Sequence, residues 1–229
     1  MQASRVGAAA ALIAAPLLGL VATCAWPPLR AGERAQIAAI AAQPGRWYIF
    51  SLFILLSSIM LVPAVLALMR LLGQTRPVWA LVAGCLAQFG ILVGIGDSAT
   101  ELMFWQMGAP GASLGQMTAL ATRYDAAPGA ALVFMIGGLA ALCGTLLLAA
   151  GLWRARAVPA WTAIAVAAGT VANIAGLSAA SIPVTIASYA LLLAAFGRIA
   201  LIVRTSPAWD PPGSPVAAKR AATVQPARN

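Results

Sequence analysis

The chain has 229 residues, of which 62% are hydrophobic and only 8% are charged, and its mean hydropathy is +0.92. Soluble domains are about 45–50% apolar and about 25% charged, so a water-soluble fold could not cover this much apolar surface. The formal charge of +9 comes from 14 basic and 5 acidic residues. The basic residues fall almost entirely between apolar runs and after the last one, which is typical of membrane topology signals, so we expect no nucleic-acid partner.

The sequence also limits the chemistry that the protein can perform. It contains no histidine, which excludes histidine metal sites and histidine general bases. It shows no Walker loop, no G-x-S-x-G, no H-E-x-x-H and no Rossmann fingerprint. We therefore predict no metal site and no cofactor, and any chemistry has to come from carboxyl groups, hydroxyls, amides and aromatic rings.

Apolar runs of about 20 residues, the length that crosses a lipid bilayer as a helix, recur along the chain. We predict an all-α fold, a polytopic transmembrane bundle of six helices within residues 1–204, with spans at 6–25, 47–69, 78–106, 130–153, 160–177 and 183–203. A signal peptide is the alternative for the first run, but this run is long and Cys24 interrupts a small-x-small cleavage site, so we favour a retained span. Residues 205–229, rich in Pro, Ser and Ala, are predicted to be a disordered cytoplasmic tail.

Two of the predicted loops contain short helical patterns. The segment ERAQIAAIAAQ, residues 33–43, places Ile37 and Ile40 on one side of an amphipathic helix. The segment SLGQMTALATRYDAA, residues 113–127, begins with Ser113 and Gln116 at the spacing of a capping box. By contrast, only residues 178–181 separate the fifth and sixth spans, which predicts an antiparallel hairpin.

The fourth span carries a glycine at every seventh residue, at Gly137, Gly144 and Gly151. This repeat keeps small residues on one seam of the helix. Because small residues let two helix backbones approach closely in a membrane, the repeat predicts close packing along this seam.

Six spans place both termini on the same side of the membrane. Ten basic residues fall on that side, at positions 5, 70, 76, 154, 156, 198, 204, 219, 220 and 228, against four on the other, at positions 30, 34, 46 and 123. The positive-inside rule then predicts a multi-pass protein of the cell (plasma) membrane with both termini in the cytoplasm. The Ala- and Arg-rich composition suggests a bacterial membrane.

The segment AGCLAQFGILVGIGDSATELMFWQ, residues 83–106, is the apolar segment that carries carboxylates. Read at helical spacing, Gly90, Gly94, Asp97, Glu101 and Trp105 form one stripe down a helix face. Asp97 falls about 28 Å along the third span, near the outer interface, where an acid can be hydrated at low cost. The stripe is therefore either a hydrated helix end or a functional surface.

On the functional interpretation, Asp97 and Glu101 are the candidate catalytic acids. Asn173 is a candidate ligand-binding residue because an amide in lipid requires a hydrogen-bond partner, although it could also serve only to join helices. Arg30 and Arg34 fall on the same side as the acids, so a structural ion pair with one of the acids is an alternative. The complete set of candidate ligand-binding residues is Trp105, Phe104, Asn173 and Tyr189, and the alternative for the interfacial aromatic residues is a simple aromatic belt.

The segment LLLAAGLWRARAVPAWTAIAVAAGT, residues 146–170, combines a glycine-rich helix, an Arg-x-Arg turn and Val-Pro-x-Trp. It resembles a broad group of uncharacterised six-helix bacterial integral membrane proteins. Those proteins tend to carry a glutamate late in the third helix, which Glu101 would match. Some of them have an arginine shortly before that glutamate, where this chain has Gly94, Gly96 and Asp97. The resemblance implies a fold and no activity.

Three functions fit these residues. The first is a non-enzymatic protein that binds an apolar or amphiphilic ligand, or a membrane partner, at a cleft lined by the Asp97/Glu101 face. The second is an intramembrane enzyme similar to the small terpene cyclases, in which Glu101 or Asp97 protonates an isoprenoid-like substrate and aromatic faces stabilise the carbocation. The third is a proton- or cation-coupled carrier, which would need a polar path into the cytoplasmic half. The lipid bilayer is a partner in all three cases.

Overall fold

The computed structural model describes residues 2–27 and 32–205, and all regular structure in them is helical. Six of the helices are long and apolar enough to cross a membrane, so the predicted all-α, polytopic bundle of six transmembrane helices is confirmed. The predicted tail lies outside the described residues except for Thr205, which ends the last helix. The helices are α1 (Gln2–Ala25), α2 (Glu33–Ala42), α3 (Pro44–Gly73), α4 (Pro77–Met107), α5 (Leu114–Asp125), α6 (Pro128–Arg154), α7 (Ala160–Ser178) and α8 (Ile182–Thr205).

Three of the long helices begin with a proline, and each of them starts before the span that was predicted for it. Pro44, Pro77 and Pro128 stand in the first turns of α3, α4 and α6. Proline suits this position because its fixed φ is already helical and the N–H that it lacks has no partner there in any helix. The helices consequently extend past the apolar runs by which the spans were predicted.

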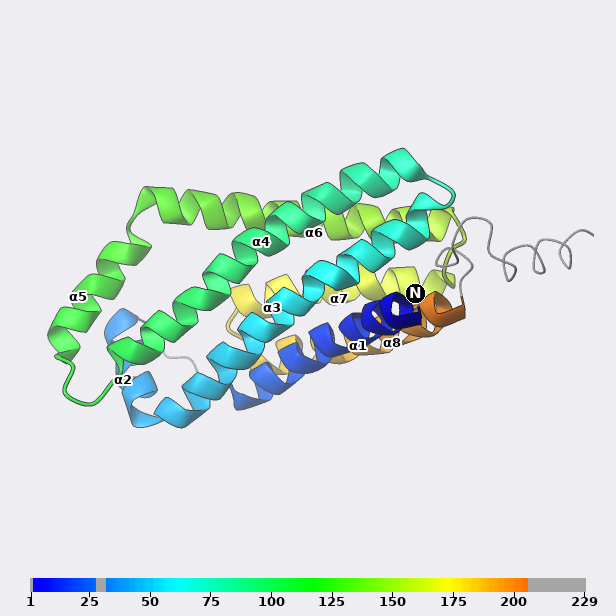
Figure 1. The fold of residues 1–229 in the computed structure, drawn as a ribbon. Helices are drawn as coiled ribbons and strands as arrows, with labels where there is room; N and C mark the ends of the chain where they lie inside the picture. The colour runs from blue at the N-terminus through cyan, green and yellow to red at the C-terminus, as the bar shows by residue number, and fades with distance from the viewer. Residues whose placement is uncertain (1, 28–31, 206–229) are drawn as a thin grey trace, which may run out of the picture.

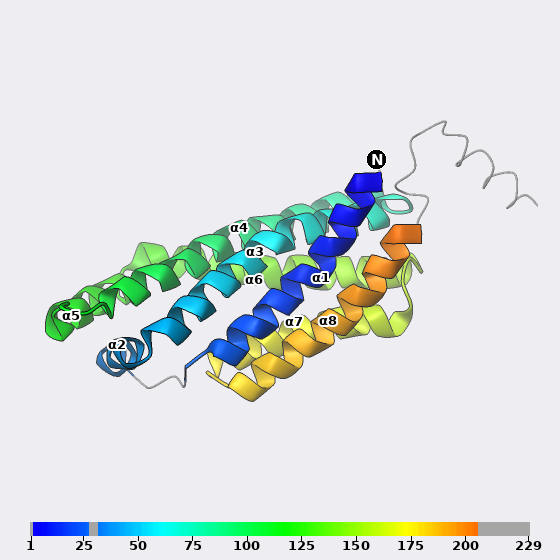
Figure 2. The ribbon, with the colours of Figure 1, turned by 60° about the horizontal axis from the view of Figure 1, so that its bottom comes forward.

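The six long helices form a closed ring in which each packs against two neighbours. Following the contacts, the order around the ring is α1, α3, α4, α6, α7, α8 and back to α1. Figures 1 and 2 show the long helices running side by side, with α1 beginning next to the end of α8. We call this the terminal end of the bundle. The short helices α2 and α5 lie together at the opposite end, which we call the far end.

The two short helices correspond to the patterns in the predicted loops. In α2, Ile37 and Ile40 are almost completely buried, with 1% and 0% of their surface exposed. At the start of α5, the Ser113 hydroxyl accepts a hydrogen bond from the Gln116 backbone N–H at 3.5 Å. The predicted N-terminal cap of this helix is therefore confirmed.

The glycine repeat of α6 allows very close packing against α4. A methyl group on Gly144 would overlap the backbone of Ala87, and one on Gly137 would overlap the Val93 side chain. From the other side, a methyl on Gly90 of α4 would overlap the backbone of α6 at Ala141. The predicted close-packed seam is confirmed, because at each of these close approaches one of the two helices contributes a glycine, which has no Cβ atom.

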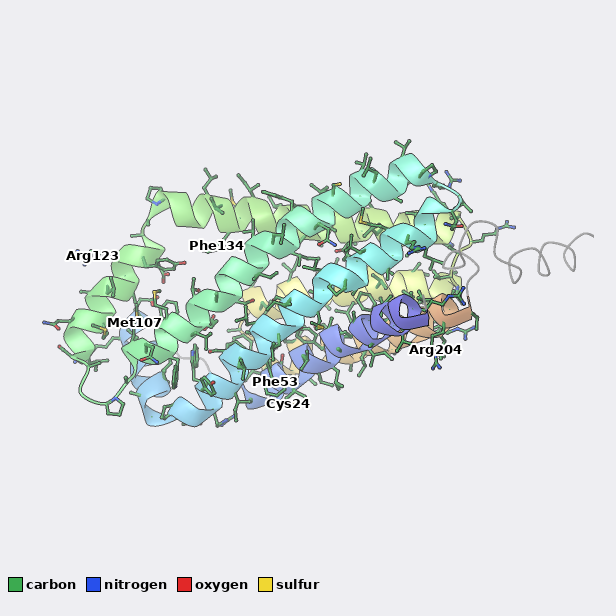
Figure 3. The ribbon with its side chains drawn as sticks, in the orientation of Figure 1. Cys24, Phe53, Met107, Arg123, Phe134 and Arg204 are labelled. Atoms are coloured by element: carbon green, nitrogen blue, oxygen red, sulfur yellow. The ribbon has the colours of Figure 1, made fainter. Side chains whose placement is uncertain are left out.

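Apolar side chains fill the bundle unequally along its length. The terminal half contains a continuous core of aliphatic residues, among them Leu12, Leu68, Leu72, Leu148, Leu152, Ile199 and Val203, each at most 1% exposed. A separate aromatic cluster closes the far end and consists of Ala22, Trp26, Ile37, Ile40, Trp47, Phe50, Phe104, Met107 and Ala121. We call these the terminal core and the far-end cluster. Figure 3 shows Met107 close to α2 and α5 at the far end.

Candidate functional site

A cavity of about 330 Å³ lies inside the ring, and all six long helices contribute to its lining. It is bounded by the terminal core, to which its lining residue Ile91 belongs, and by the far-end cluster, to which Trp26 and Phe50 belong. The lining residues are Thr23, Trp26, Phe50, Ile54, Ser58, Leu61, Gly90, Ile91, Val93, Gly94, Asp97, Ser98, Glu101, Phe134, Gly138, Ala141, Asn173, Ile174, Leu177 and Tyr189.

The acidic stripe of α4 faces this cavity over most of its length. Gly90, Gly94, Asp97 and Glu101 all line it. A methyl group on Gly94 would have no atom within 4 Å, so this glycine borders open space rather than a neighbouring helix. The stripe therefore belongs to the interior wall of the ring.

Glu101 carries a polar atom that has no partner. Its Oε2 atom is buried and makes no hydrogen bond within residues 2–27 and 32–205, whereas Asp97 is an exposed residue of the same wall. Among the described residues, no basic side chain forms an ion pair with either acid. A buried polar atom without a partner costs about 1–3 kcal/mol, so a native structure that keeps one calls for an explanation.

Trp26, which lines the same cavity, carries a second unpartnered atom. The residue is only 7% exposed, and its indole Nε1–H makes no hydrogen bond to any described residue. Its ring stacks on Phe50 with the ring centres 5.1 Å apart and the planes 2° from parallel. Two residues of the cavity lining, Trp26 and Glu101, thus each keep a buried polar atom without a partner in the part of the chain that the structure describes.

Two consecutive residues at the start of α3 hold these groups in place. The Arg46 guanidinium donates to the backbone oxygens of Ala25 at 3.3 Å and Trp26 at 3.2 Å. This places a positive charge at the carboxyl end of α1, where the helix dipole favours it. The Trp47 indole N–H donates to the Glu101 backbone oxygen at 3.1 Å. The first turn of α3 therefore positions both Trp26 and Glu101.

The hydroxyl groups of the lining direct their protons toward backbone oxygens. Thr23 Oγ1 donates to the Gly19 oxygen at 2.9 Å, and Ser58 Oγ donates to the Ile54 oxygen at 3.0 Å. Ser98 Oγ lies 2.9 Å from Ser58 Oγ. Since the Ser58 proton is already used, Ser98 is the donor in this pair, and these hydroxyls offer mainly lone pairs to the cavity.

Asn173 and Tyr189 meet on the opposite wall. Asn173 Nδ2 donates to Ser188 Oγ at 3.1 Å, so the amide has the partner that an amide in lipid requires. The Tyr189 hydroxyl also interacts with the Asn173 side chain, and the Tyr189 ring packs over Gly19 of α1. Both residues line the cavity together with Asp97 and Glu101.

Phe104 and Trp105 lie elsewhere, in or against the far-end cluster. Phe104 is 8% exposed and contacts Tyr124 of α5 edge to face, with ring centres 6.4 Å apart. Trp105 packs on Tyr48 of α3 at 4.7 Å. Neither residue is part of the cavity lining. Of the six candidate site residues, the structure brings together Asp97, Glu101, Asn173 and Tyr189.

The aromatic walls of the cavity come from residues that the sequence analysis did not select. They are Trp26, Phe50 and Phe134, with Phe134 on the far-end half of α6 (Figure 3). Phe50, Ile54, Ser58 and Leu61 follow each other at steps of four, four and three, the same helical spacing as the acidic stripe. That helical periodicity was the sequence signal by which these α3 residues could have been found. Trp26 had no such signal, because it follows the end of α1 and its position depends on Arg46, 20 residues away.

The arginine alternative receives no support from the described residues. Arg30 lies outside them, and Arg34 is exposed on α2 and lines a hollow against α5 rather than the cavity. Within residues 2–27 and 32–205, no group of three or more His, Cys, Asp or Glu side chains is placed to hold a metal ion.

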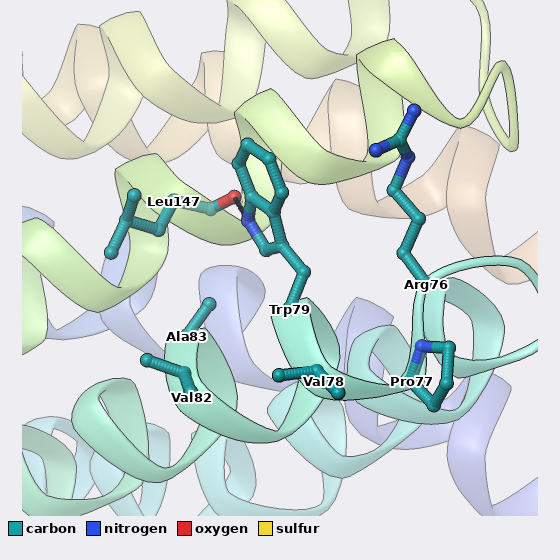
Figure 4. A pocket seen from close by; sticks show the side chains of 7 residues that line it. All are labelled: Arg76, Pro77, Val78, Trp79, Val82, Ala83 and Leu147. Carbon is teal, nitrogen blue, oxygen red and sulfur yellow. Dashed lines mark hydrogen bonds between the residues drawn. The ribbon is translucent and has the colours of Figure 1, made fainter.

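A second hollow runs along the outside of the bundle near the terminal end. It measures about 580 Å³ and is lined by Arg76, Pro77, Val78, Trp79, Val82, Ala83 and Leu147 (Figure 4). Here the Trp79 indole N–H donates to the Leu147 backbone oxygen at 2.8 Å. We call this hollow the α4/α6 groove.

No protein-family model, curated protein or solved structure matches the chain. Its function is therefore argued from its own residues.

Proposed function

We propose that the protein binds an amphiphilic ligand inside the ring, at the cavity lined by the Asp97/Glu101 face of α4. The observation that carries this proposal is that Trp26 and Glu101, which both line one cavity, each keep a buried polar atom, Nε1 and Oε2, without a hydrogen-bond partner among the described residues. Each of them costs about 1–3 kcal/mol when left unsatisfied. A ligand with a polar head group could bond both side chains once they turn toward the cavity, while its apolar part replaces contacts that the cavity leaves unmade.

The membrane setting agrees with an amphiphilic ligand. We propose that the far end faces outward and both termini face the cytoplasm of a bacterial cell, on the distribution of basic residues. The cavity then lies in the outer half of the bilayer, at a depth where amphiphiles present their polar groups. The resemblance to the six-helix bacterial membrane proteins is likewise a proposal and adds no activity.

A binding measurement tests this function. Phenylbutanol, whose hydroxyl both donates and accepts, is titrated by calorimetry against the protein in nanodiscs of phosphatidylcholine. Gly138 lines the cavity, and a methyl on it would have no atom within 4 Å, so Gly138→Leu fills the cavity without a clash at Cβ. Gly197→Leu on α8 is the matched control, because Gly197 is equally uncrowded and does not line the cavity.

We expect saturable binding to the wild type and to Gly197→Leu, and none to Gly138→Leu. If the wild type saturably binds neither phenylbutanol nor the amine or carboxylate with the same tail, or if Gly138→Leu binds as well as Gly197→Leu, the proposed function is wrong.

A proton-initiated isoprenoid cyclase is the second candidate, and one observation favours it. The Glu101 carboxyl group shares the cavity with the aromatic rings of Phe50, Phe134 and Tyr189. A carboxylic acid there could protonate an alkene or epoxide, and the faces of these rings could stabilise the resulting cation. Conversion of an isoprenoid epoxide to a cyclic isomer, detected by mass spectrometry and abolished in Glu101→Gln, would establish this activity.

The third function considered, a proton- or cation-coupled carrier, has less support. Such a carrier needs polar groups that continue from the cavity to the other side of the membrane. Below the cavity, the ring is filled mainly by the apolar terminal core, and the buried polar residue Thr162 in the first turn of α7 carries no ionisable group.

A further inference from the structure

We infer that the ligand of this cavity is a lipophilic cation, with a protonated amine or similar head group directed at Glu101 and Asp97. This inference rests on the proposed function and specifies its ligand class. Three features of the lining carry it: the sign of its charges, the direction of its hydrogen bonds and its aromatic content.

The charged groups of the lining all have the same sign. Asp97 and Glu101 are its two acids, and no Arg, Lys or His is among its residues. Arg46 holds the lining residue Trp26 through its backbone oxygen but is itself absent from the lining, and its guanidinium is bound to the backbone oxygens of Ala25 and Trp26. An anionic head group would find no basic partner beside these two carboxyl groups, whereas a cation would favour their ionised forms.

The hydrogen-bonding groups of the lining are mostly acceptors. The protons of Thr23 and Ser58 go to backbone oxygens, and Ser98 donates to Ser58. Together with the two carboxyl groups, these oxygens favour a head group that donates hydrogen bonds, as an ammonium does three times. The unused Trp26 N–H would bond an oxygen next to the amine.

The aromatic residues of the lining favour the same class of ligand. Trp26, Phe50, Phe134 and Tyr189 come from four different segments and surround the same space as the two acids. Aromatic faces attract cations electrostatically, most strongly where water is excluded, and they also pack against apolar chains. A cavity of about 330 Å³ accommodates an amine with a short apolar tail.

Three probes that share one tail separate charge from size. Phenylbutylamine is cationic at pH 7, phenylbutanol is neutral and phenylbutyrate is anionic. Each is titrated against the wild type in nanodiscs of phosphatidylcholine, a zwitterionic lipid, and the same titration with Gly138→Leu subtracts partition into the bilayer. We expect the amine to bind about tenfold more tightly than the alcohol, and the carboxylate to bind most weakly.

The acids are tested by Asp97→Asn and Glu101→Gln, which preserve side-chain shape. We expect each variant to lower the preference for the amine, and the double variant to abolish it while still binding phenylbutanol. Retained alcohol binding shows that the variants are folded. If the alcohol binds the wild type as tightly as the amine, or if the double variant keeps the preference, the inference is wrong while the proposed function stands. If none of the probes binds, the proposed function itself is wrong.

Discussion

The cavity and the α4/α6 groove lie toward opposite ends of α4, and each contains a tryptophan. The groove is the larger hollow, at about 580 Å³ against about 330 Å³. Yet the Trp79 N–H is bonded to the Leu147 oxygen, and the Arg76 and Arg154 guanidinium groups lie 6.0 and 5.5 Å from its ring centre. The Trp26 N–H has no partner among the residues that the structure describes. A hollow whose polar groups already have hydrogen-bond partners can be filled by lipid alone. A hollow lined by residues with unsatisfied polar atoms indicates a ligand.

The largest effect should come from the seam that supports both hollows. Gly144→Val would force a side chain into the Ala87 backbone, and overpacking against rigid backbone should lower the free energy of unfolding by about 3 kcal/mol or more. Gly197→Val is the control, since a Cβ there meets no atom within 4 Å. Reversible unfolding by SDS in mixed micelles measures both. Equal loss in the two variants would show that the close approach of α4 and α6 is not important for stability.

An intermediate effect should distinguish the two tryptophans under the same substitution. Trp79→Phe removes a hydrogen bond to Leu147, while Trp26→Phe removes a buried donor that has no partner. Without ligand, Trp26→Phe should therefore cost less stability than Trp79→Phe, by about 1–3 kcal/mol. The same unfolding assay measures the difference. The comparison between the hollows fails if Trp26→Phe is the more destabilising variant.

The smallest effect should occur at the far end, where α2 packs against α5. Burial, a hydrogen bond with the Asp125 carboxyl and repulsion from its charge raise the pKa of Glu33. A carboxyl whose pKa is higher in the folded protein favours folding when protonated, so this contribution is present at low pH and is lost as pH rises through the raised pKa. The melting temperature of the wild type should fall with rising pH above about 4.5, relative to that of Glu33→Gln. Parallel pH profiles would refute this.

Helical spacing predicted the bundle and most of one cavity wall, because periodicity determines which residues share a helix face. It placed Gly90, Gly94, Asp97 and Glu101 on one face, and the structure puts that face inside the ring. It could not show which neighbour covers each part of the face. Trp105 continues the same stripe but packs on Tyr48, because the last turn of α4 extends into the far-end cluster.

The rest of the site depends on contacts between distant parts of the chain. The position of Trp26 follows from a bond to Arg46, and that of Glu101 is fixed by a bond from Trp47, 54 residues away. Neither contact has a local pattern in the sequence. Likewise, whether Trp26 Nε1 and Glu101 Oε2 find hydrogen-bond partners depends on the positions of all the atoms around them. Only a three-dimensional structure gives those positions.

The adjacency of Arg46 and Trp47 has a geometric consequence for recognition. Arg46 holds the chain at Trp26, and Trp47 holds α4 at Glu101. The distance between the Trp26 N–H and the Glu101 carboxyl oxygen therefore depends on a single helical turn. A rotation of that turn would shift the two attachment points relative to each other and alter the length of head group that can bridge Trp26 and Glu101. Because residues 43–47 are not among the lining residues, substitutions there would retune selectivity for head-group size without replacing any residue of the cavity wall.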